Sequence, residues 1–395
     1  MLPLLKGVRV IEVGAVVLGP YAGQILADLG AEVIKVEPLE GDIARHAHPQ
    51  GTGGGALFVN NNRNKRMLAL DLKRPEGRGA FAKLVKGADV LFHNMRLDAA
   101  DRLGLGFEQV AAINPNIVHC AATGFGRSGQ YRDRPAFDDI IQAASGLAGL
   151  AALQNGIPQF GPTIVADKVA ALHAVYGILA ALFARERGRA GPFRVEAPMF
   201  EAMVAFTMNE HLSAATFAAD GAPGYPRLLS PDRRPFRTAD GWIAVLPYTE
   251  AQWRRFLSAI DRSEVCETAW FRSPARRQAH IGELYAIVAA SLEAHSTDTW
   301  IEALEAIDVP CSRVATLVEI LSDPHLIEIG FFDVPEGFPE GVERAIPQPV
   351  LFTGIDQMPD QPPHALGADS RAVLRDFGCD DAAIDALIVA GVVAA

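Results

Sequence analysis

One aspartate stands where its carboxylate could do chemistry. Asp167 directly precedes an apolar helical pattern. One stripe of this pattern consists of Val169, Leu172, Tyr176, Leu179 and Phe183, and beside it lie Val175, Ile178 and Leu182. An aspartate at this place is most simply an N-cap, which accepts hydrogen bonds from the first backbone N–H groups. It also suits a nucleophile, because a helix N-terminus keeps a carboxylate ionised and oriented in a dry pocket. The position alone leaves both interpretations open.

Basic side chains gather in NNRNKRMLALDLKR, residues 61–74, and Arg102 follows another strand-like run. A solvated charged face is the usual explanation of such a cluster. The alternative is phosphate binding, because Arg and Lys match phosphate groups in charge and hydrogen bonding. Charge alone does not decide between these two interpretations.

Other motifs carry weaker signals. The turn GAVVLGPYAG, residues 14–23, precedes Glu37 at a place where nicotinamide enzymes bind ribose, but it lacks the G-x-G-x-x-G spacing. A nicotinamide-dependent oxidoreductase is therefore the weaker alternative. The glycines of residues 51–55 are interpreted as a turn, with a mobile lid as the alternative. The ten histidines show no ligand spacing, so no metal is predicted.

The elements that must position these residues alternate between strand and helix. Short β-branched runs predict strands at residues 8–13, 31–36, 67–70, 90–93 and 117–121. Helical spacing predicts helices at residues 21–29, 75–86 and 167–185. Strands separated by helices of this length favour a doubly wound, Rossmann-like parallel sheet in an α/β protein.

A glycine- and proline-rich segment predicts a second domain. We expect a large Rossmann-like domain over residues 1–220, a linker over 221–235 and a smaller α+β domain over 236–333. Residues 334–395 are expected to form a linker and to return to the large domain. They end in a short amphipathic helix at 382–390, which cannot form a core of its own.

Composition bounds the partners and the compartment. The net charge is -11 and the basic residues are dispersed, which disfavours nucleic acid and anionic membranes as partners. Cys120, Cys266, Cys311 and Cys379 fit neither a disulfide framework nor a zinc site, so buried thiols in the cytoplasm are expected. The most apolar window, residues 169–183, is shorter than the roughly 20 residues of a membrane span, so a buried helix is predicted. The first residues lack the pattern of a signal peptide.

Segments along nearly the whole chain resemble one protein family. They include LKGVRVIEVGAVVLGPYAGQILADLGAEVIKVEP, NRNKR-x-LALDLK, HN-x-RLDAADRLGL, NPNIVHCAATGFG, FDDIIQAASGL and VADKVAALHA. Farther along, FRTADGWIAV, VPCSRV and DPHL follow in the same order. Together these segments resemble the class III CoA-transferases, such as formyl-CoA and carnitine CoA-transferases. The 2-methylacyl-CoA racemases belong to the same superfamily.

The resemblance implies a Rossmann-like large domain built from both chain ends and a small domain inserted between them. It also implies an obligate homodimer of two interlocked subunits, with active sites at the subunit interface. The expected substrates are an acyl-CoA and a carboxylic acid. CoA enters as part of a substrate, and no permanently bound cofactor is expected.

The resemblance makes Asp167 the nucleophile. Its carboxylate attacks the donor thioester to give a mixed anhydride, the released CoA then forms an aspartyl-CoA thioester, and the acceptor acid takes the CoA. Backbone N–H groups near residues 14–19 are candidate donors to the oxyanions. The positions that match CoA contacts of the family are Val16, Leu70, Lys73, Asn94, Met95, Arg102 and Met199.

Two substrate-pocket positions depart from well-known members of the family. Oxalate-using members carry glutamine at Val17 and tyrosine at Phe137, so a larger or less polar acceptor than oxalate is predicted. Racemase members carry a histidine at Phe137, and phenylalanine cannot transfer a proton. A transferase is therefore favoured over a racemase. A non-catalytic CoA-binding protein is a further alternative.

Overall fold

The computed structural model describes all 395 residues, and the chain divides into two compact units. The first comprises Met1–Leu147, Phe160–Thr207 and Gly330–Ala395, and the second comprises Ala148–Gln159 and Met208–Ile329. The expected boundaries differ from this division, because the segment predicted as a linker, residues 221–235, lies inside the second unit. There the Gln154 side chain donates to the backbone oxygens of Ser230 and Arg233, at 3.3 and 3.0 Å. The glycines and prolines of this segment thus mark irregular backbone within a unit.

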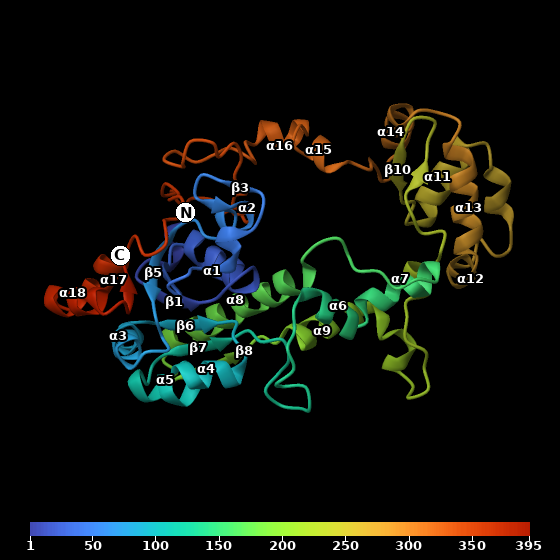
Figure 1. Ribbon diagram of the computed structural model, residues 1–395. Coiled ribbons are helices and arrows are strands. Elements are labelled where there is room, and N and C mark those ends of the chain that lie inside the picture. Colours follow the sequence, from blue (N-terminus) through green and yellow to red (C-terminus); the bar gives the residue numbers. More distant parts are fainter. The chain divides into compact units, whose positions relative to one another are not determined.

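A seven-stranded sheet is the centre of the first unit (Figure 1). Its strand order is β12-β5-β2-β1-β6-β7-β8, and all pairs are parallel except β12 with β5. The strands are β1 (Arg9–Val13), β2 (Glu32–Glu37), β5 (Lys65–Leu70), β6 (Val90–His93), β7 (Val118–Ala121), β8 (Phe193–Glu196) and β12 (Val393–Ala394). The five predicted strands are present, and the two outermost strands, β8 and β12, were not predicted. A large parallel sheet in a mixed α/β protein is confirmed.

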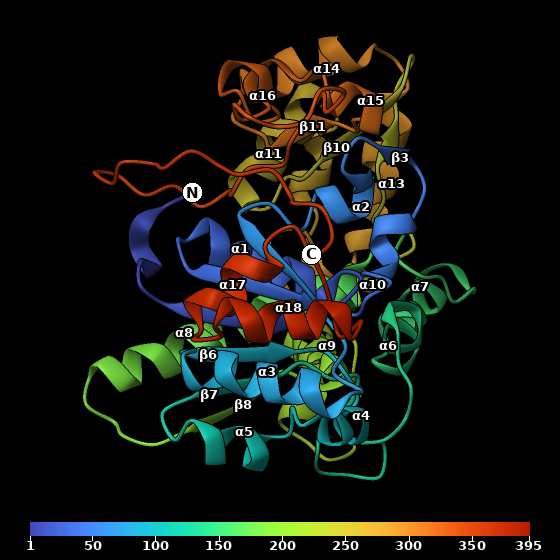
Figure 2. The ribbon, with the colours of Figure 1, turned by 60° about the vertical axis from the view of Figure 1, so that its left-hand side comes forward.

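Helices cover both faces of this sheet. The helices of the first unit are α1 (Leu18–Asp28), α2 (Ala56–Val59), α3 (Pro75–Lys86), α4 (Leu97–Leu103), α5 (Phe107–Ile113), α6 (Asp138–Ala144), α8 (Val165–Glu186), α9 (Met199–His211), α17 (Ser370–Asp376) and α18 (Asp381–Val389). Helices α1 and α8 pack on one face, where Val10 of β1 joins their core. Helices α3, α17 and α18 pack on the other face, where the next residue, Ile11, joins a second core (Figure 2). Strands buried on both faces explain the continuous apolar runs in the sequence.

Helix α8 is longer than predicted and buries a different face. It has 22 residues, and by length and composition it is the one helix of the protein that could cross a membrane. Ala170, Ala174 and Ile178 are fully buried in the core, which accounts for its apolar composition. The expected stripe points outward instead, since Leu172 and Tyr176 are 50% and 60% exposed within the chain. The prediction that this segment is too short to span a membrane is therefore wrong, because the helix extends beyond residues 169–183 at both ends.

The second unit has its own core. A three-stranded antiparallel sheet is formed by β9 (Phe236–Arg237), β10 (Trp242–Val245) and β11 (Cys311–Arg313). Its helices are α7 (Leu147–Asn155), α10 (Pro226–Leu229), α11 (Glu250–Ala259), α12 (Pro274–Ala279), α13 (Ile281–Leu292), α14 (Thr297–Glu305), α15 (Leu317–Ile320) and α16 (Pro324–Glu328). Phe256, Phe271 and Val288 are among its fully buried core residues.

Residues 51–55 were predicted to form a turn, and the four cysteines were predicted to be buried. The glycine-rich stretch forms a two-stranded hairpin of β3 (Gln50–Gly51) and β4 (Gly54–Gly55). Gly53 at its turn has a φ of 98°, which favours glycine, so the turn interpretation is confirmed. Of the four cysteines, three are buried, but Cys311 is only half-buried.

Candidate active site

Asp167 lies inside the first turn of α8 and is not its N-cap. The helix begins at Val165, and Ile164 occupies the N-cap position without a side-chain hydrogen bond. The backbone N–H of Leu18, the first residue of α1, lies close enough to the Asp167 carboxylate to lower its pKa. The N-cap interpretation of this aspartate is therefore wrong, and its carboxylate faces the N-terminus of α1.

The cap of α8 comes from another helix. Oδ1 of Asp138, the first residue of α6, accepts from the backbone N–H groups of Ala166 and Asp167 at 2.7 and 3.1 Å. Two carboxylates therefore meet at the start of α8. Sequence reasoning missed Asp138, although an acidic residue at the start of an apolar helical segment is the signal that could have indicated a capping role.

The surroundings of Asp167 disfavour its charged form. Burial, and next the charge of Asp138, raise the pKa of Asp167 from 3.8 to about 6, while the Leu18 N–H lowers it. No basic side chain forms an ion pair with Asp167 or Asp138. At pH 7 to 8 the Asp167 carboxylate is still mostly ionised, but it is more basic than an ordinary aspartate.

The turn between β1 and α1 leads directly into Leu18, whose N–H lies beside Asp167. Val16 adopts the left-handed conformation, with a φ of 67°, which is unusual and strained for a β-branched residue. Its N–H donates to Oδ1 of Asp42 at 3.1 Å. The side chain of Asn94 holds the N–H and the oxygen of Ala15 at 3.1 and 3.0 Å. The turn is thus held from two sides directly before Leu18.

A close backbone approach makes this turn possible. A Cβ atom on Gly14 would lie 2.8 Å from Cα of Gly19, and one on Gly19 would lie 2.7 Å from Cα of Gly14. Both positions therefore require glycine for steric reasons. These two glycines belong to the motif that was compared with a dinucleotide fingerprint.

A network of buried charges lies beneath the turn. Nζ of Lys35 contacts Oδ2 of Asp42 at 2.9 Å, Oε1 of Glu12 at 3.2 Å and the oxygen of Gly14 at 2.7 Å. Nζ of Lys65 pairs with Oε2 of Glu12 at 2.8 Å. Burial opposes the charge of Lys35, but Glu12 and Asp42 raise its pKa above the ordinary value. Burial lowers the pKa of Lys65 to about 8.

These pairings correct the phosphate-binding interpretation of residues 61–74. Lys65 is fully buried, and Arg63 pairs with Asp28. Arg66 pairs with Glu32 and Asp376. Their positive charges therefore neutralise carboxylates within the fold. Lys73 differs, because it is exposed, forms no ion pair and lines a cavity.

That cavity, of about 450 Å³, opens at the carboxyl ends of the central strands. Ligands of open α/β sheets bind at this edge. The cavity contains four of the seven residues expected to contact CoA, namely Leu70, Lys73, Asn94 and Met95. Gly14 and Ala15 line it too, so one turn borders the cavity and also contacts Asp167 through Leu18. The residues after β2, Pro38 to Glu40, also line the cavity and were not predicted.

The other three expected CoA contacts do not line this cavity. Met199 is 4% exposed and packs in the core between the sheet and α8, so its side chain is not accessible to a ligand. Arg102 is exposed and pairs with Asp98 one turn earlier in α4, at 2.9 Å. Val16 offers the cavity neither its side chain nor its N–H, which Asp42 holds.

The two predicted substrate-pocket residues are not brought into one pocket. Val17 is buried and lines a separate, mainly apolar hollow between α1, α8 and residues 346–352. Phe137 is 74% exposed directly before α6. Within one chain its ring therefore does not close a site around Asp167.

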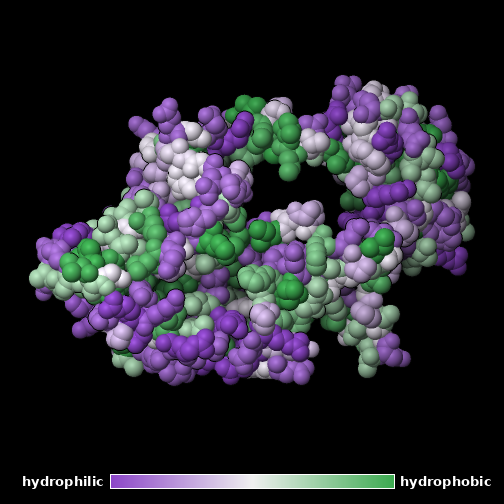
Figure 3. All heavy atoms as spheres, viewed as in Figure 1, coloured by the Kyte–Doolittle hydropathy of each residue, from purple (hydrophilic) through white to green (hydrophobic).

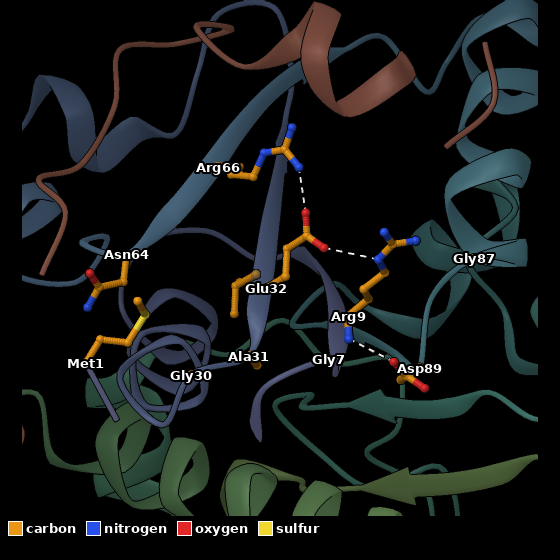
Figure 4. A pocket seen from close by; sticks show the side chains of 11 residues that line it. Met1, Gly7, Arg9, Gly30, Ala31, Glu32, Asn64, Arg66, Gly87 and Asp89 are labelled. Atoms are coloured by element: carbon orange, nitrogen blue, oxygen red, sulfur yellow. Dashed lines mark hydrogen bonds and ion pairs between the residues drawn. The ribbon is translucent and has the colours of Figure 1, made fainter. Parts of the chain in front are cut away.

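A further hollow lies at the opposite, amino-terminal edge of the strands (Figure 4). Glu32 accepts from Nε of Arg9 at 3.1 Å and also pairs with Arg66. The backbone N–H of Arg9 donates to Asp89 at 2.8 Å. Because its charged groups pair with each other, this hollow presents no free cation for a phosphate.

Glu37 does not resemble a ribose-binding acid in its contacts. It is 2% exposed, and its carboxylate accepts from Nη2 and Nε of Arg45, at 2.7 and 2.8 Å, and from the N–H of Asp42.

His93 is also buried, and burial followed by the nearby His119 lowers its pKa to about 3, so it stays neutral. No group of three His, Cys, Asp or Glu side chains is placed to hold a metal ion.

The sequence and the fold match known proteins over nearly their whole length. The model of CoA-transferase family III matches residues 5–370. A succinate–glutarate CoA-transferase of Agrobacterium fabrum is 29% identical over 389 residues, which cover 95% of this chain and 96% of the relative. A succinyl-CoA–D-citramalate CoA-transferase of Chloroflexus aurantiacus is 32% identical over 345 residues, covering 82% and 81%. The crystal structure of a CAIB/BAIF family protein from Brucella suis has a TM-score of 0.80 at 27% identity, covering 95% and 100%.

These similarities decide between the interpretations left open by the sequence. The family match extends over both units, and it overturns the alternative of a nicotinamide-dependent oxidoreductase. The ion pair of Glu37 with Arg45 also argues against ribose binding by Glu37. CoA-transferases use CoA thioesters as substrates. The chain belongs to CoA-transferase family III, and it is an enzyme of that class.

Proposed function

We propose that this enzyme moves CoA from an acyl-CoA donor to a carboxylic acid through a covalent intermediate on Asp167. One observation carries the proposal. The Asp167 carboxylate lies at the start of α8 beside Asp138 and the N-terminus of α1, without a basic partner, and burial and Asp138 raise its pKa to about 6. Such a carboxylate is ionised at neutral pH, poorly stabilised in the ground state and therefore suited to nucleophilic attack.

The reaction is a sequence of exchanges at carbonyl carbons. An Asp167 oxygen attacks the thioester carbon and the C–S bond breaks. This step releases the CoA thiolate and joins the donor acyl group to Asp167 as a mixed anhydride. The thiolate then attacks the Asp167 carbonyl, releasing the donor acid with one oxygen from the aspartate. The acceptor carboxylate then attacks the aspartyl-CoA thioester, which releases the CoA thiolate and forms a second anhydride. The thiolate attacks the acceptor carbonyl of this anhydride, so the acyl-CoA of the acceptor leaves and the Asp167 carboxylate is restored.

The start of α1 can stabilise the oxyanions formed in these steps. The first N–H groups of a helix have no partner inside the helix, and the N-terminus carries partial positive charge. The N–H of Leu18 lies beside the Asp167 carboxylate and lowers its pKa. The N–H groups of Ala15 and Val16 are held by Asn94 and Asp42, so those of Val17 and Gly19 are the candidate oxyanion donors beside Leu18. The strained Val16, with its bond to Asp42, directs the turn.

CoA is placed in the cavity lined by Leu70, Lys73, Asn94 and Met95, with Lys73 as a partner for a phosphate group. Relatives are named for succinate, glutarate and D-citramalate. Short dicarboxylic acids are therefore the first acceptors to test, with succinyl-CoA as the donor. This agrees with an acceptor larger than oxalate, as Val17 and Phe137 suggested.

The active enzyme in this proposal is an interlocked homodimer in the cytoplasm. Large apolar side chains lie open on α8 within one chain, among them Leu172, Tyr176 and Phe183, and Figure 3 shows apolar surface over this helix. Exposed apolar patches of this kind support an interface. A partner subunit would also close the site that Phe137 leaves open. Light scattering after size-exclusion chromatography should give twice the mass of 42.3 kDa.

The test of the proposal is to locate the covalent adduct. The enzyme is incubated with succinyl-CoA, treated with hydroxylamine, digested and analysed by mass spectrometry. We expect a hydroxamate on Asp167, and none in Asp167→Ala, which should still bind CoA. CoA binding without any adduct would support a non-catalytic binding protein. Deuterium exchange at the α-carbon of a 2-methylacyl-CoA in heavy water, without transfer, would support a racemase.

A further inference from the structure

The first turn of α8 has no cap from the residues that precede it. Ile164 at the N-cap position makes no side-chain hydrogen bond. Oδ1 of Asp138 takes over this role from α6 and accepts from two consecutive N–H groups, those of Ala166 and Asp167, at 2.7 and 3.1 Å. The backbone of the proposed nucleophile is therefore held directly by a second carboxylate.

The orientation of Asp138 is itself fixed. Its Oδ2 accepts from Nε2 of Gln142 at 2.6 Å, one turn later in α6. Gln142 is fully buried, its Oε1 accepts from the N–H of Gly161 at 2.8 Å, and its Nε2 also reaches the oxygen of Thr163 at 3.3 Å. Both oxygens of Asp138 are thus engaged, and the chain that leads into α8 is tied to the same glutamine.

The charges near Asp167 leave Asp138 as the one that acts on it. Asp139 on α6 is exposed to solvent, which screens its charge. Lys168 on α8 donates its Nζ to Oγ1 of Thr163 at 2.8 Å and pairs with neither carboxylate. The first turn of α1 contains no acidic residue and offers Asp167 only the Leu18 N–H. An anion fixed so close, in a half-buried place, acts at low screening.

We propose that Asp138 is a positioning residue, which holds the backbone of Asp167 through the cap of α8 and makes the Asp167 carboxylate a stronger base by its own charge. This inference rests on the proposed function. The two actions can be separated, because the hydrogen bonds depend on an oxygen acceptor and the effect on basicity depends on the negative charge. The raised pKa of Asp167, for which Asp138 is the largest cause after burial, agrees with the second action.

Two variants separate these actions. Asp138→Ala removes both, so kcat should fall about 10- to 100-fold, as for the loss of a group that orients a reacting side chain. The double variant Asp138→Asn with Gln142→Glu keeps the hydrogen bonds to the N–H groups of α8 and of Gly161, and it loses only the 3.3 Å bond from residue 142 to the oxygen of Thr163. The amide oxygen introduced on α6 accepts from the two N–H groups of α8, its NH2 group donates to the introduced carboxylate, and that carboxylate accepts from Gly161. The negative charge then lies on residue 142 instead of residue 138, and so farther from Asp167.

The experiment measures kcat and kcat/KM for succinyl-CoA with glutarate between pH 4.5 and 9 for the wild type, both variants and the control Asp139→Asn. In the wild type, kcat/KM should fall as the pH drops through about 6, because Asp167 becomes protonated. The double variant should recover most of kcat, while this fall moves to lower pH by about 0.5 to 1 unit, as expected when a like charge is moved away. Asp139→Asn should follow the wild type.

An unchanged pH profile in the double variant would overturn the effect of charge. A wild-type kcat in Asp138→Ala would overturn the positioning role. Adduct mapping on the wild type keeps this test distinct from that of the proposed function. If Asp167 is labelled but both variants behave as the wild type, the inference about Asp138 alone is wrong, whereas absence of label on Asp167 removes the proposed function itself.

Discussion

The first unit buries ionisable side chains in two different ways. Under the β1–α1 turn, Lys35 contacts two carboxylates, of Glu12 and Asp42, and these opposite charges keep it protonated. At the start of α8, Asp167 and Asp138 meet with no basic side chain between them, and the pKa of Asp167 rises to about 6. Both environments border the same turn, which gives the oxygen of Gly14 to Lys35 and precedes the helix N-terminus that Asp167 faces. Their effects on charge are nevertheless opposite.

The difference shows which buried charges are structural and which are available for reaction. A buried charge with opposite partners and full hydrogen bonding is held in one state and gives geometry, here the strained backbone of Val16. A carboxylate that only N–H groups stabilise stays reactive at a cost in stability. The paired network thus shapes the turn, and the turn leads into Leu18, whose N–H lies beside the unpaired carboxylate.

The largest effect is expected on turnover. Asp167→Asn removes the oxygen anion that we propose as the nucleophile but keeps the shape of the side chain, so kcat should fall by about 10³-fold or more, as for other covalent nucleophiles. CoA binding, measured by isothermal titration calorimetry, should remain. Residual transfer at more than about a tenth of the wild-type rate would place the nucleophile elsewhere.

The next largest effect is expected on folding in the paired network. Lys35→Met leaves Glu12 and Asp42 buried without their shared cation, which should lower the free energy of unfolding by about 3 to 5 kcal/mol. Urea denaturation followed by circular dichroism measures this change. Lys86→Met, at an exposed lysine of α3, is the matched control and should change the free energy by less than about 0.5 kcal/mol. Equal effects of both changes would break the comparison.

A smaller effect of opposite sign is expected for the unpaired carboxylate. The folded-state pKa of Asp167 is raised from 3.8 to about 6, so ionising it destabilises the fold progressively as the pH rises through this window. Asp167→Asn should therefore be more stable than the wild type above pH 6, by about 1 to 3 kcal/mol, and equally stable near pH 3.5. Thermal unfolding at pH 3.5, 5, 6.5 and 8 checks this. A variant that is less stable at pH 8 would show that Asp167 is satisfied in the folded protein.

The smallest effect extends the comparison to two cations. Lys73 has no ion-pair partner and lines the cavity at the carboxyl edge of the sheet, whereas Arg102 pairs with Asp98 on an exposed helix surface. Lys73→Ala should raise the KM for succinyl-CoA about tenfold, as for the loss of one charge-assisted hydrogen bond. Arg102→Ala should change this KM less than about twofold. Steady-state kinetics at constant ionic strength separates the two.

Most of the fold could be predicted from the sequence because its strands are buried on both faces. Continuous apolar runs such as residues 90–93 indicate such strands whatever surrounds them. The edge strand β8 was missed, since Phe193–Glu196 alternates with Arg and Glu and no apolar run marks it. Strand β12 has two residues and exists only through its pairing with β5.

The candidate site was predictable where one residue carries the role and less so where several segments share it. Asp167 stood out beside its apolar helix, but its first-turn position and the cap from Asp138 depend on how α6 meets α8. The basic residues of the segment 61–74 looked free because their carboxylate partners, such as Glu12 and Asp28, lie far away in the sequence. Pairing across a fold is a tertiary property that local charge patterns do not reveal.

The most direct measurement of the central claim follows oxygen atoms. Transfer through an anhydride on Asp167 leaves one oxygen of the acceptor carboxylate on the aspartate in every turnover. The enzyme is turned over with succinyl-CoA and glutarate labelled with oxygen-18 in both carboxyl groups, then digested and analysed by mass spectrometry. The account predicts that the peptide containing Asp167 gains 18O, with fragment ions placing the label on Asp167. Full turnover with no label on this residue would contradict it.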